Sequence, residues 1–308
     1  MRRLKIKHVT TYEYADTVTL LPHKLLLRPR EGRDIRIESA KLTLEPAHHL
    51  HWQRDMYDNA VAWATFTEQG RRLSIVSHLV LQHYDDQPLD FLMADYAVFY
   101  PFQYVPAELA DLCPYVGPLF AQDLPLLETW LRPFWPPGQA VETYVLLDRI
   151  NQAIAFNFTH QPREEPGVQT PAATLVKRAG SCRDFATLFI EACHCLGLAA
   201  RFVSGYFYSP TLTRGQGATH AWSEVYLPGA GWKGFDSTSG QMVGNDHIAL
   251  AVGRHPEAVP PVSGSFLAAI HQWPIMRVEV DVAEIPARRR TQSAAATKYR
   301  ESLPQSVR

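Results

Sequence analysis

The chain of 308 residues has few cysteines, no long apolar run and almost no net charge, and each of these absences argues against a large class of proteins. It has only four cysteines, too few for a disulfide framework at this length. It has no apolar run near the roughly 18 residues that a membrane-spanning helix needs. Its 30 basic and 31 acidic side chains give a net charge of -1, whereas nucleic-acid binding rests on clustered Lys and Arg. We therefore expect neither membrane nor nucleic acid as a partner.

The first residues also lack the apolar core of a secretory signal and pass directly into an alternating pattern. Together with the small number of cysteines, this favours a reduced, cytoplasmic setting. Hydrophobic residues make up 46% and charged residues 20% of the chain, which is typical of a globular protein and excludes a disordered one. The length predicts two domains, each with its own core.

Residues 1–100 have the pattern of an antiparallel β-domain. Residues 41–45 alternate with period two, which predicts a strand with one buried face. Asp58 and Asn59 separate two further segments rich in β-formers, so they are predicted to form a turn.

The rest of the chain changes character. Prolines punctuate residues 101–138, which are predicted to form a linker with short helices. A core follows over residues 139–286, and residues 287–308 carry no apolar periodicity, so we expect a disordered tail. The core is predicted to contain two helices and then three strands, at residues 139–156, 181–197, 199–208, 219–227 and 231–238.

The start of the second core helix carries a cysteine in a position that favours an anion. Ser181 is a candidate N-cap, and Asp184 supplies the carboxylate of a capping box. Cys182 then lies at the first helical position, where unpaired amides and the helix dipole lower a thiol pKa. Taken alone, such a cysteine is more often structural than catalytic.

The two strands after this helix add a histidine and a carboxylate. If Val225 opposes Gly231 across a five-residue loop, the same register pairs His220 with Asp236 on one face of the sheet. The carboxylate can then hold the imidazole tautomer while the other ring nitrogen takes the proton of a thiol. Cys182, His220 and Asp236 are therefore the candidate catalytic residues.

These segments resemble the bacterial transglutaminase-like superfamily. The resemblance rests on Gly-Ser-Cys-Arg-Asp-Phe-Ala at residues 180–186, Thr-His-Ala-Trp-Ser-Glu-Val at 219–225, Gly-Trp-Lys-Gly-Phe-Asp-Ser-Thr at 231–238, and on residues 198–206, 246–254 and 259–264. Residues 8–14 and 25–30 are similar to the β-rich N-terminal domain of its bacterial two-domain branch. The chain departs from the family pattern in having Ser181 before the cysteine and Asp58 in place of a turn glycine.

The resemblance implies an α+β protein, in which a β-rich N-terminal domain precedes a papain-like core. In that core a helix carrying the cysteine packs on an antiparallel sheet carrying the histidine and the aspartate. The resemblance further implies that Cys182 is the nucleophile, His220 the base and Asp236 the orienting carboxylate. The N–H of Cys182 is the expected oxyanion donor.

Such a triad implies a cysteine-dependent acyl transfer from an amide bond through a thioester. Water as acceptor gives a peptidase or amidase, and an amine gives transglutaminase-type transfer. We favour hydrolysis, because the near-neutral chain shows no evident site for a protein amine donor. The resemblance also implies a peptide or amide-containing substrate and an association with an ATP-grasp-type ligase system. The alternative is a non-catalytic peptide-binding or scaffold protein that retains the fold.

Neither a cofactor nor a metal site is expected. Cys193, His194 and Cys195 are adjacent, but on a helix the two thiols point about 200° apart. We expect His194 to point outward to solvent, away from both thiols.

Overall fold

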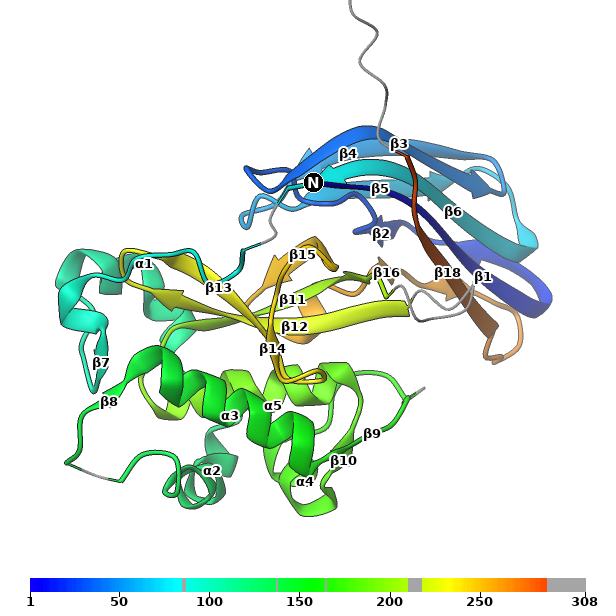
Figure 1. Ribbon diagram of the computed structural model, residues 1–308. Coiled ribbons are helices and arrows are strands. Elements are labelled where there is room, and N and C mark those ends of the chain that lie inside the picture. The colour runs from blue at the N-terminus through cyan, green and yellow to red at the C-terminus, as the bar shows by residue number, and fades with distance from the viewer. Residues whose placement is uncertain (85–86, 137, 164, 210–217, 287–308) are drawn as a thin grey trace, which may run out of the picture.

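The computed structural model describes residues 1–84, 87–136, 138–163, 165–209 and 218–286. The predicted disordered tail, residues 287–308, lies outside the described residues. The protein is α+β, as predicted. Two β-sheets built mainly from the N-terminal region pack beside an antiparallel sheet that carries helices on its other side (Figure 1).

The N-terminal region forms two facing sheets. Its strands are β1 (Arg2–Leu20), β2 (His23–Leu25), β3 (Ile35–Glu45), β4 (His48–Arg54), β5 (Ala60–Phe66) and β6 (Gly70–His83). From Leu73 to His83, every second side chain of β6 is buried, which is the period of a strand with one face in a core. Leu73 and Ile75 of β6 pack against Leu25 and Ala64 from the other sheet, so a hydrophobic core fills the space between the sheets.

The C-terminal strands return to these sheets. Strand β16 (Val262–Ser263) pairs with β2, and both β17 (Phe266–Leu267) and β18 (Ile275–Glu284) pair antiparallel with β1. The structure thus differs from the predicted division of the chain, which gave residues 139–286 to the core. The pairing joins segments that are far apart in the sequence, and a local hydrophobic pattern carries no information about such a pairing.

The core sheet has the strand order β14-β13-β12-β11-β15. Its strands are β11 (Ala200–Phe207), β12 (Ala218–Leu227), β13 (Gly231–Asp236), β14 (Gln241–Met242) and β15 (His247–Gly253). The helices are α1 (Pro106–Val116), α2 (Leu124–Leu131), α3 (Thr143–Asn157), α4 (Pro171–Lys177) and α5 (Cys182–Cys195). The short elements are β7 (Phe99–Tyr100), β8 (Val141–Glu142), β9 (Thr159–His160), β10 (Ala179–Gly180) and three single-turn helices, Asp95–Ala97, Ala121–Asp123 and Pro256–Ala258.

Helix α5 is the central helix of the core. Its stripe of Phe185, Leu188, Phe189 and Ala192 is fully buried and packs on β11 and β12. Burying four such side chains contributes several kcal/mol. The predicted helix is therefore confirmed, and its packing fixes where its first residue, Cys182, lies relative to the sheet.

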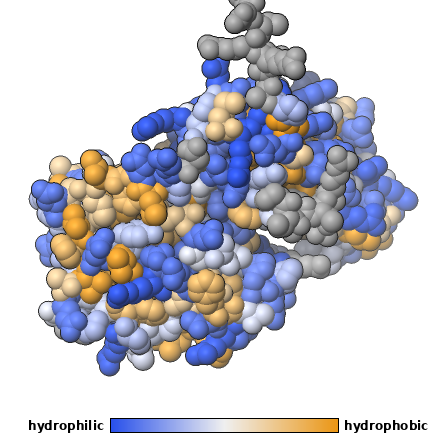
Figure 2. All heavy atoms as spheres, viewed as in Figure 1, coloured by the Kyte–Doolittle hydropathy of each residue, from blue (hydrophilic) through white to orange (hydrophobic). Residues whose placement is uncertain are grey.

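The outer surface is mixed in character. Figure 2 shows apolar side chains gathered toward the end of the molecule where α1 lies, while the N-terminal sheets present mostly hydrophilic residues on this face. The exposed apolar side chains near α1 include Phe99, Val105 and Leu109. Among the described residues, no helix combines the length and the apolarity needed to cross a membrane.

The side chain of Asn59 joins the N-terminal region to the edge of the core sheet. The side chain of Asn59 is fully buried and pairs with the backbone of Val252 in β15. Its Nδ2 donates to the Val252 carbonyl at 2.8 Å, and its Oδ1 accepts from the Val252 N–H at 2.9 Å. The same Nδ2 also donates to Oδ2 of Asp55 at 2.9 Å. The turn predicted at Asp58 and Asn59 therefore covers part of the outer edge of β15.

Replacement of Asn59 by alanine is expected to destabilise the protein by about 1–3 kcal/mol, because it leaves a buried backbone N–H and carbonyl of Val252 without partners. Urea unfolding of the purified variant measures this loss. Gln53→Ala, an exposed position on β4, is the matched control and should change little. Equal stability of the two variants would contradict a docking role for Asn59.

Candidate active site

The first turn of α5 is held by a buried capping box, as predicted. Oδ2 of Asp184 accepts from the Ser181 N–H at 2.8 Å and from the Ser181 hydroxyl at 2.9 Å. The same carboxylate accepts from Arg163 Nε at 2.9 Å and from the Gln169 N–H at 2.7 Å. Asp184 is fully buried. Cys182 is thus the first residue of a rigid helix start, where free amides favour a negative charge.

The thiol of Cys182 differs in acidity from the other two thiols of the helix. Burial raises its pKa, but hydrogen bonds with His160 and His220 outweigh burial and bring the pKa down to about 6. Burial raises the pKa of Cys193 well above its ordinary value and that of Cys195 to about 11. Of the three thiols of α5, Cys182 is therefore the one that is ionised at neutral pH.

His220 and Asp236 lie in contact on the core sheet. The distance from His220 Nε2 to Asp236 Oδ2 is 3.0 Å, and the side chains are 11% and 2% exposed. Burial lowers the pKa of His220, while the interactions with Asp236 and Cys182 raise it more, to about 10. Since Asp236 engages Nε2, Nδ1 is the ring nitrogen left for the thiol. The arrangement favours a thiolate beside an imidazolium.

The register predicted for the β12–β13 hairpin is wrong by two residues. The structure pairs Val225 with Lys233 and Leu227 with Gly231, so the loop has three residues, 228–230, rather than five. A shift of two residues leaves every side chain on its face of the sheet. Asp236 therefore still shares the face of His220 and reaches it diagonally.

His160 is a site residue that the sequence pattern did not indicate. Strand β9 pairs in parallel with β10, which places His160 opposite Gly180, two residues before Cys182. The N–H of Gln161 donates to the Gly180 carbonyl at 2.8 Å and fixes this alignment. A two-residue parallel bridge leaves no periodic signal in the sequence, so the contact could not be predicted from the residues.

His247, at the start of β15, is the second missed residue. Its Nε2 lies 3.2 Å from Asp236 Oδ2, and its side chain is 5% exposed. In the pairing of β11 with β15, Phe207 lies opposite His247 and Gly205 lies opposite Ala249. On its other edge, β11 pairs with β12, and there Gly205 lies opposite His220. Sequence-based assignment of residues 247–253 to a strand beside β11 would have placed His247 near His220.

The outward orientation predicted for His194 is wrong. His194 is buried, and its Nδ1 lies 2.8 Å from Glu191 Oε1. Glu191 also accepts from the N–H groups of Leu119 and Phe120. The segment before α2 thus covers this side of α5, which the helical period alone does not reveal.

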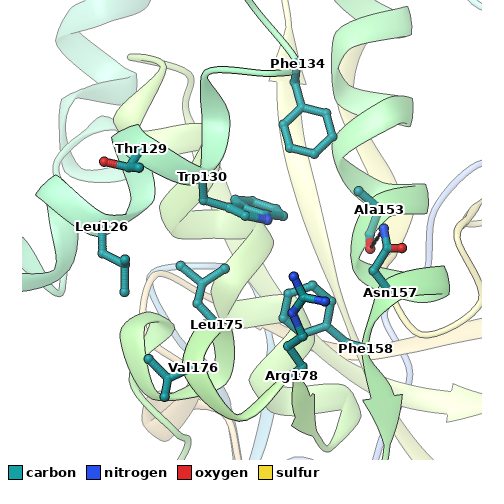
Figure 3. A pocket seen from close by; sticks show the side chains of 10 residues that line it. All are labelled: Leu126, Thr129, Trp130, Phe134, Ala153, Asn157, Phe158, Leu175, Val176 and Arg178. Carbon is teal, nitrogen blue, oxygen red and sulfur yellow. Dashed lines mark hydrogen bonds between the residues drawn. The ribbon is translucent and has the colours of Figure 1, made fainter.

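A pocket of about 450 Å³ opens elsewhere on the core, among α2, α3 and α4 (Figure 3). Cys182, His220 and Asp236 are not among its lining residues, which are Leu126, Thr129, Trp130, Phe134, Ala153, Asn157, Phe158, Leu175, Val176 and Arg178. The lining is mainly apolar and carries one guanidinium group. This pocket is therefore separate from these three side chains.

Two segments of the chain match known families. Residues 4–82 match the bacterial transglutaminase-like N-terminal region, and residues 139–237 match the transglutaminase-like superfamily. An uncharacterized protein of Mycobacterium tuberculosis (strain H37Rv) is 29% identical over 91% of this chain and 92% of its own length, and an uncharacterized protein of Mycobacterium bovis gives the same values.

Among solved structures, the crystal structure of a "putative cysteine protease" from Cytophaga hutchinsonii is similar, with a TM-score of 0.69. The likeness covers 93% of this chain and 92% of that chain at 19% sequence identity. At this identity the likeness shows a common fold, and it extends over both the N-terminal sheets and the core.

Proposed function

Because the chain belongs to the transglutaminase-like superfamily, with a bacterial transglutaminase-like N-terminal region before the core, we propose that it is a cysteine-dependent enzyme that acts on amide bonds. The proposed reaction is hydrolysis of a peptide-like amide through a thioester. Cys182 is proposed as nucleophile, His220 as general acid and base, and Asp236 as the group that orients His220.

One observation carries this proposal: a thiol at a capped helix start is hydrogen-bonded to a histidine that an aspartate holds. The pKa values of about 6 for Cys182 and about 10 for His220 leave the pair charged between those values. The 3.0 Å contact with Asp236 fixes the imidazolium. A buried structural cysteine needs none of these features, and Cys193 on the same helix has the opposite shift in its thiol pKa.

Acylation begins when the Cys182 thiolate attacks the carbonyl carbon of the amide and forms a C–S bond. Negative charge moves to the carbonyl oxygen, where the Cys182 N–H at the helix start is the proposed donor. The C–N bond then breaks as the His220 imidazolium gives its proton to the departing amine. The products are a thioester on Cys182 and a neutral His220.

Deacylation uses the same groups in reverse. Neutral His220 takes a proton from a water molecule, which attacks the thioester carbonyl. The C–S bond breaks, a carboxylic acid leaves, and the thiolate and imidazolium are restored. Water is the proposed acceptor because a chain with a net charge of -1 gives little overall electrostatic attraction for a charged protein amine donor.

The proposal predicts an acyl-enzyme on a single cysteine. Incubation with a nitrophenyl ester of an N-acylated amino acid, followed by an acid quench, should add one acyl group to the wild-type protein. Intact mass and peptide mapping should place this group on Cys182, and hydroxylamine should remove it. The thiolate at neutral pH is the physical reason for this selectivity.

Cys182→Ala should take up no acyl group, whereas Cys195→Ala, on the same helix, should behave as wild type, because burial raises the pKa of Cys195. Equal acylation of wild type and Cys182→Ala would overturn the assignment. Release of free acid in the presence of a small primary amine would support hydrolysis. Quantitative capture of the acyl group by the amine would instead support amine transfer.

A further inference from the structure

The carboxylate of Asp236 is shared between two histidines. Its Oδ2 lies 3.0 Å from His220 Nε2 and 3.2 Å from His247 Nε2. The same oxygen accepts from the hydroxyl of Ser239 at 2.9 Å, and Oδ1 accepts from the Thr238 N–H at 2.9 Å. An ionised carboxylate has about four lone-pair sites, so Asp236 is close to fully satisfied.

The backbone indicates which nitrogen of His247 carries the proton. The N–H of Gly244 points at His247 Nδ1, with a distance of 3.4 Å between the nitrogens. Nδ1 therefore acts as an acceptor, and in a neutral imidazole the proton then lies on Nε2. With Nδ1 accepting from Gly244, His247 donates its Nε2–H to Asp236 Oδ2.

This tautomer argues against a metal site in the same place. His220, Asp236 and His247 offer one ligand atom each, and these atoms lie within 4.8 Å of one another. A metal on His247 Nε2 needs the lone pair of that nitrogen, and the proton would then move to Nδ1. The Nδ1–H would then face the N–H of Gly244, so two hydrogen-bond donors would meet without an acceptor. The contacts favour a hydrogen-bonded network of His220, Asp236 and His247.

Packing holds the His247 ring in this orientation. The Phe207 ring contacts both histidines, with centroid distances of 4.9 Å to His247 and 5.3 Å to His220. Trp222 lies against His247 edge to face at 5.2 Å. His83 Nε2 lies 3.0 Å from the backbone carbonyl oxygen of His247. These contacts restrict the His247 ring, so it can in turn fix Asp236.

We propose that His247 is a positioning residue for the function proposed above: as a hydrogen-bond donor to Asp236 Oδ2, it fixes the carboxylate that holds His220 at the thiol of Cys182. His247 takes no proton and touches no reacting atom. Without its donor, Asp236 gains freedom to rotate, His220 is less confined, and the Cys182 thiolate loses part of its stabilisation.

The test compares His247→Gln with His247→Leu in the full chain. The amide nitrogen of glutamine reaches the position of Nε2 and can donate to Asp236, whereas leucine fills the space without a donor. The rate of Cys182 alkylation by iodoacetamide is measured from mildly acidic to mildly basic pH. In His247→Leu, the midpoint of this profile should rise by about half a pH unit to one unit, and alkylation near pH 6 should therefore slow about 2- to 6-fold.

His247→Gln should retain the wild-type midpoint. Thermal unfolding of each variant accompanies the titration, because a purely structural role would lower Tm without moving the midpoint. A wild-type midpoint in His247→Leu would overturn the positioning role while leaving the proposed function intact. If wild-type Cys182 itself alkylates with an ordinary thiol midpoint, the proposed function fails instead. Equal midpoint shifts in both variants would also overturn the inference, since the donor would then be irrelevant.

Discussion

Replacing His220 by alanine is expected to slow alkylation of Cys182 near pH 7 by about 30-fold, the largest effect on reactivity of any single substitution outside Cys182. With a pKa of about 6, most of the wild-type thiol is ionised at this pH. Without the imidazolium, the pKa returns toward the ordinary thiol range, and burial opposes ionisation further. Only a few per cent of the thiol then remains as thiolate.

The sign of the pH dependence follows from the same pair. The Cys182 pKa is lowered in the folded protein, so reactivity in the wild type appears as pH rises through about 6. In His220→Ala, it should appear only at clearly basic pH. Thr219→Val, one residue earlier on β12, is the matched control and should keep the wild-type profile. His160→Ala should have a smaller effect than His220→Ala, because the buried Asp236 carboxylate holds His220 and stabilises its charge. The reverse order would contradict the role given to His220.

Replacing Asp184 by alanine is expected to destabilise the protein by about 3–5 kcal/mol, the largest effect on folding. The carboxylate is fully buried and holds the start of α5 together with Arg163 and Gln169. Its removal leaves the Arg163 guanidinium without its buried partner and several N–H groups without an acceptor. Urea unfolding should show this loss. Asp111→Ala, at an exposed position of α1, should cost far less.

Asp184 also predicts how stability depends on pH. Burial raises its pKa, but hydrogen bonds from Gln169 and Ser181 and the charge of Arg163 lower it more. A carboxylate with a lowered pKa in the folded state stabilises the protein above its unfolded pKa of about 4, and this stabilisation is lost as pH falls. Asp184→Asn should therefore be less stable at neutral pH but lose less on acidification. An unchanged acid profile would contradict this.

Local rules predicted most of α5 and its first turn. The apolar stripe, the Ser181 cap and the Asp184 capping box each depend on residues within a few positions of one another. The faces of the β12–β13 hairpin were also predictable, because period two fixes which side chains share a face. The register was not: an alternating pattern is unchanged by a shift of two residues, and the structure differs from the prediction by that amount.

Contacts between distant segments could not be predicted in the same way. Strand β18 joins β1, and β9 meets β10, through pairings that no hydrophobic period encodes. His160 and His247 depend on such pairings, and so both were missed. His194 was misplaced because the segment that covers it precedes α2, far from it in the sequence. The residues thus indicated the three side chains that we propose as catalytic, while the fold placed His160 and His247 beside them.

The most direct test of the proposed thiolate–imidazolium pair is a titration of the Cys182 thiolate itself. The ultraviolet absorbance of the thiolate is followed with pH in the wild type and in Cys182→Ser, and the difference between them isolates Cys182. The structure predicts a single ionisation with a midpoint near the pKa of about 6. A midpoint at the ordinary thiol value of about 8.5 would show that the pair does not form and would contradict the proposed function.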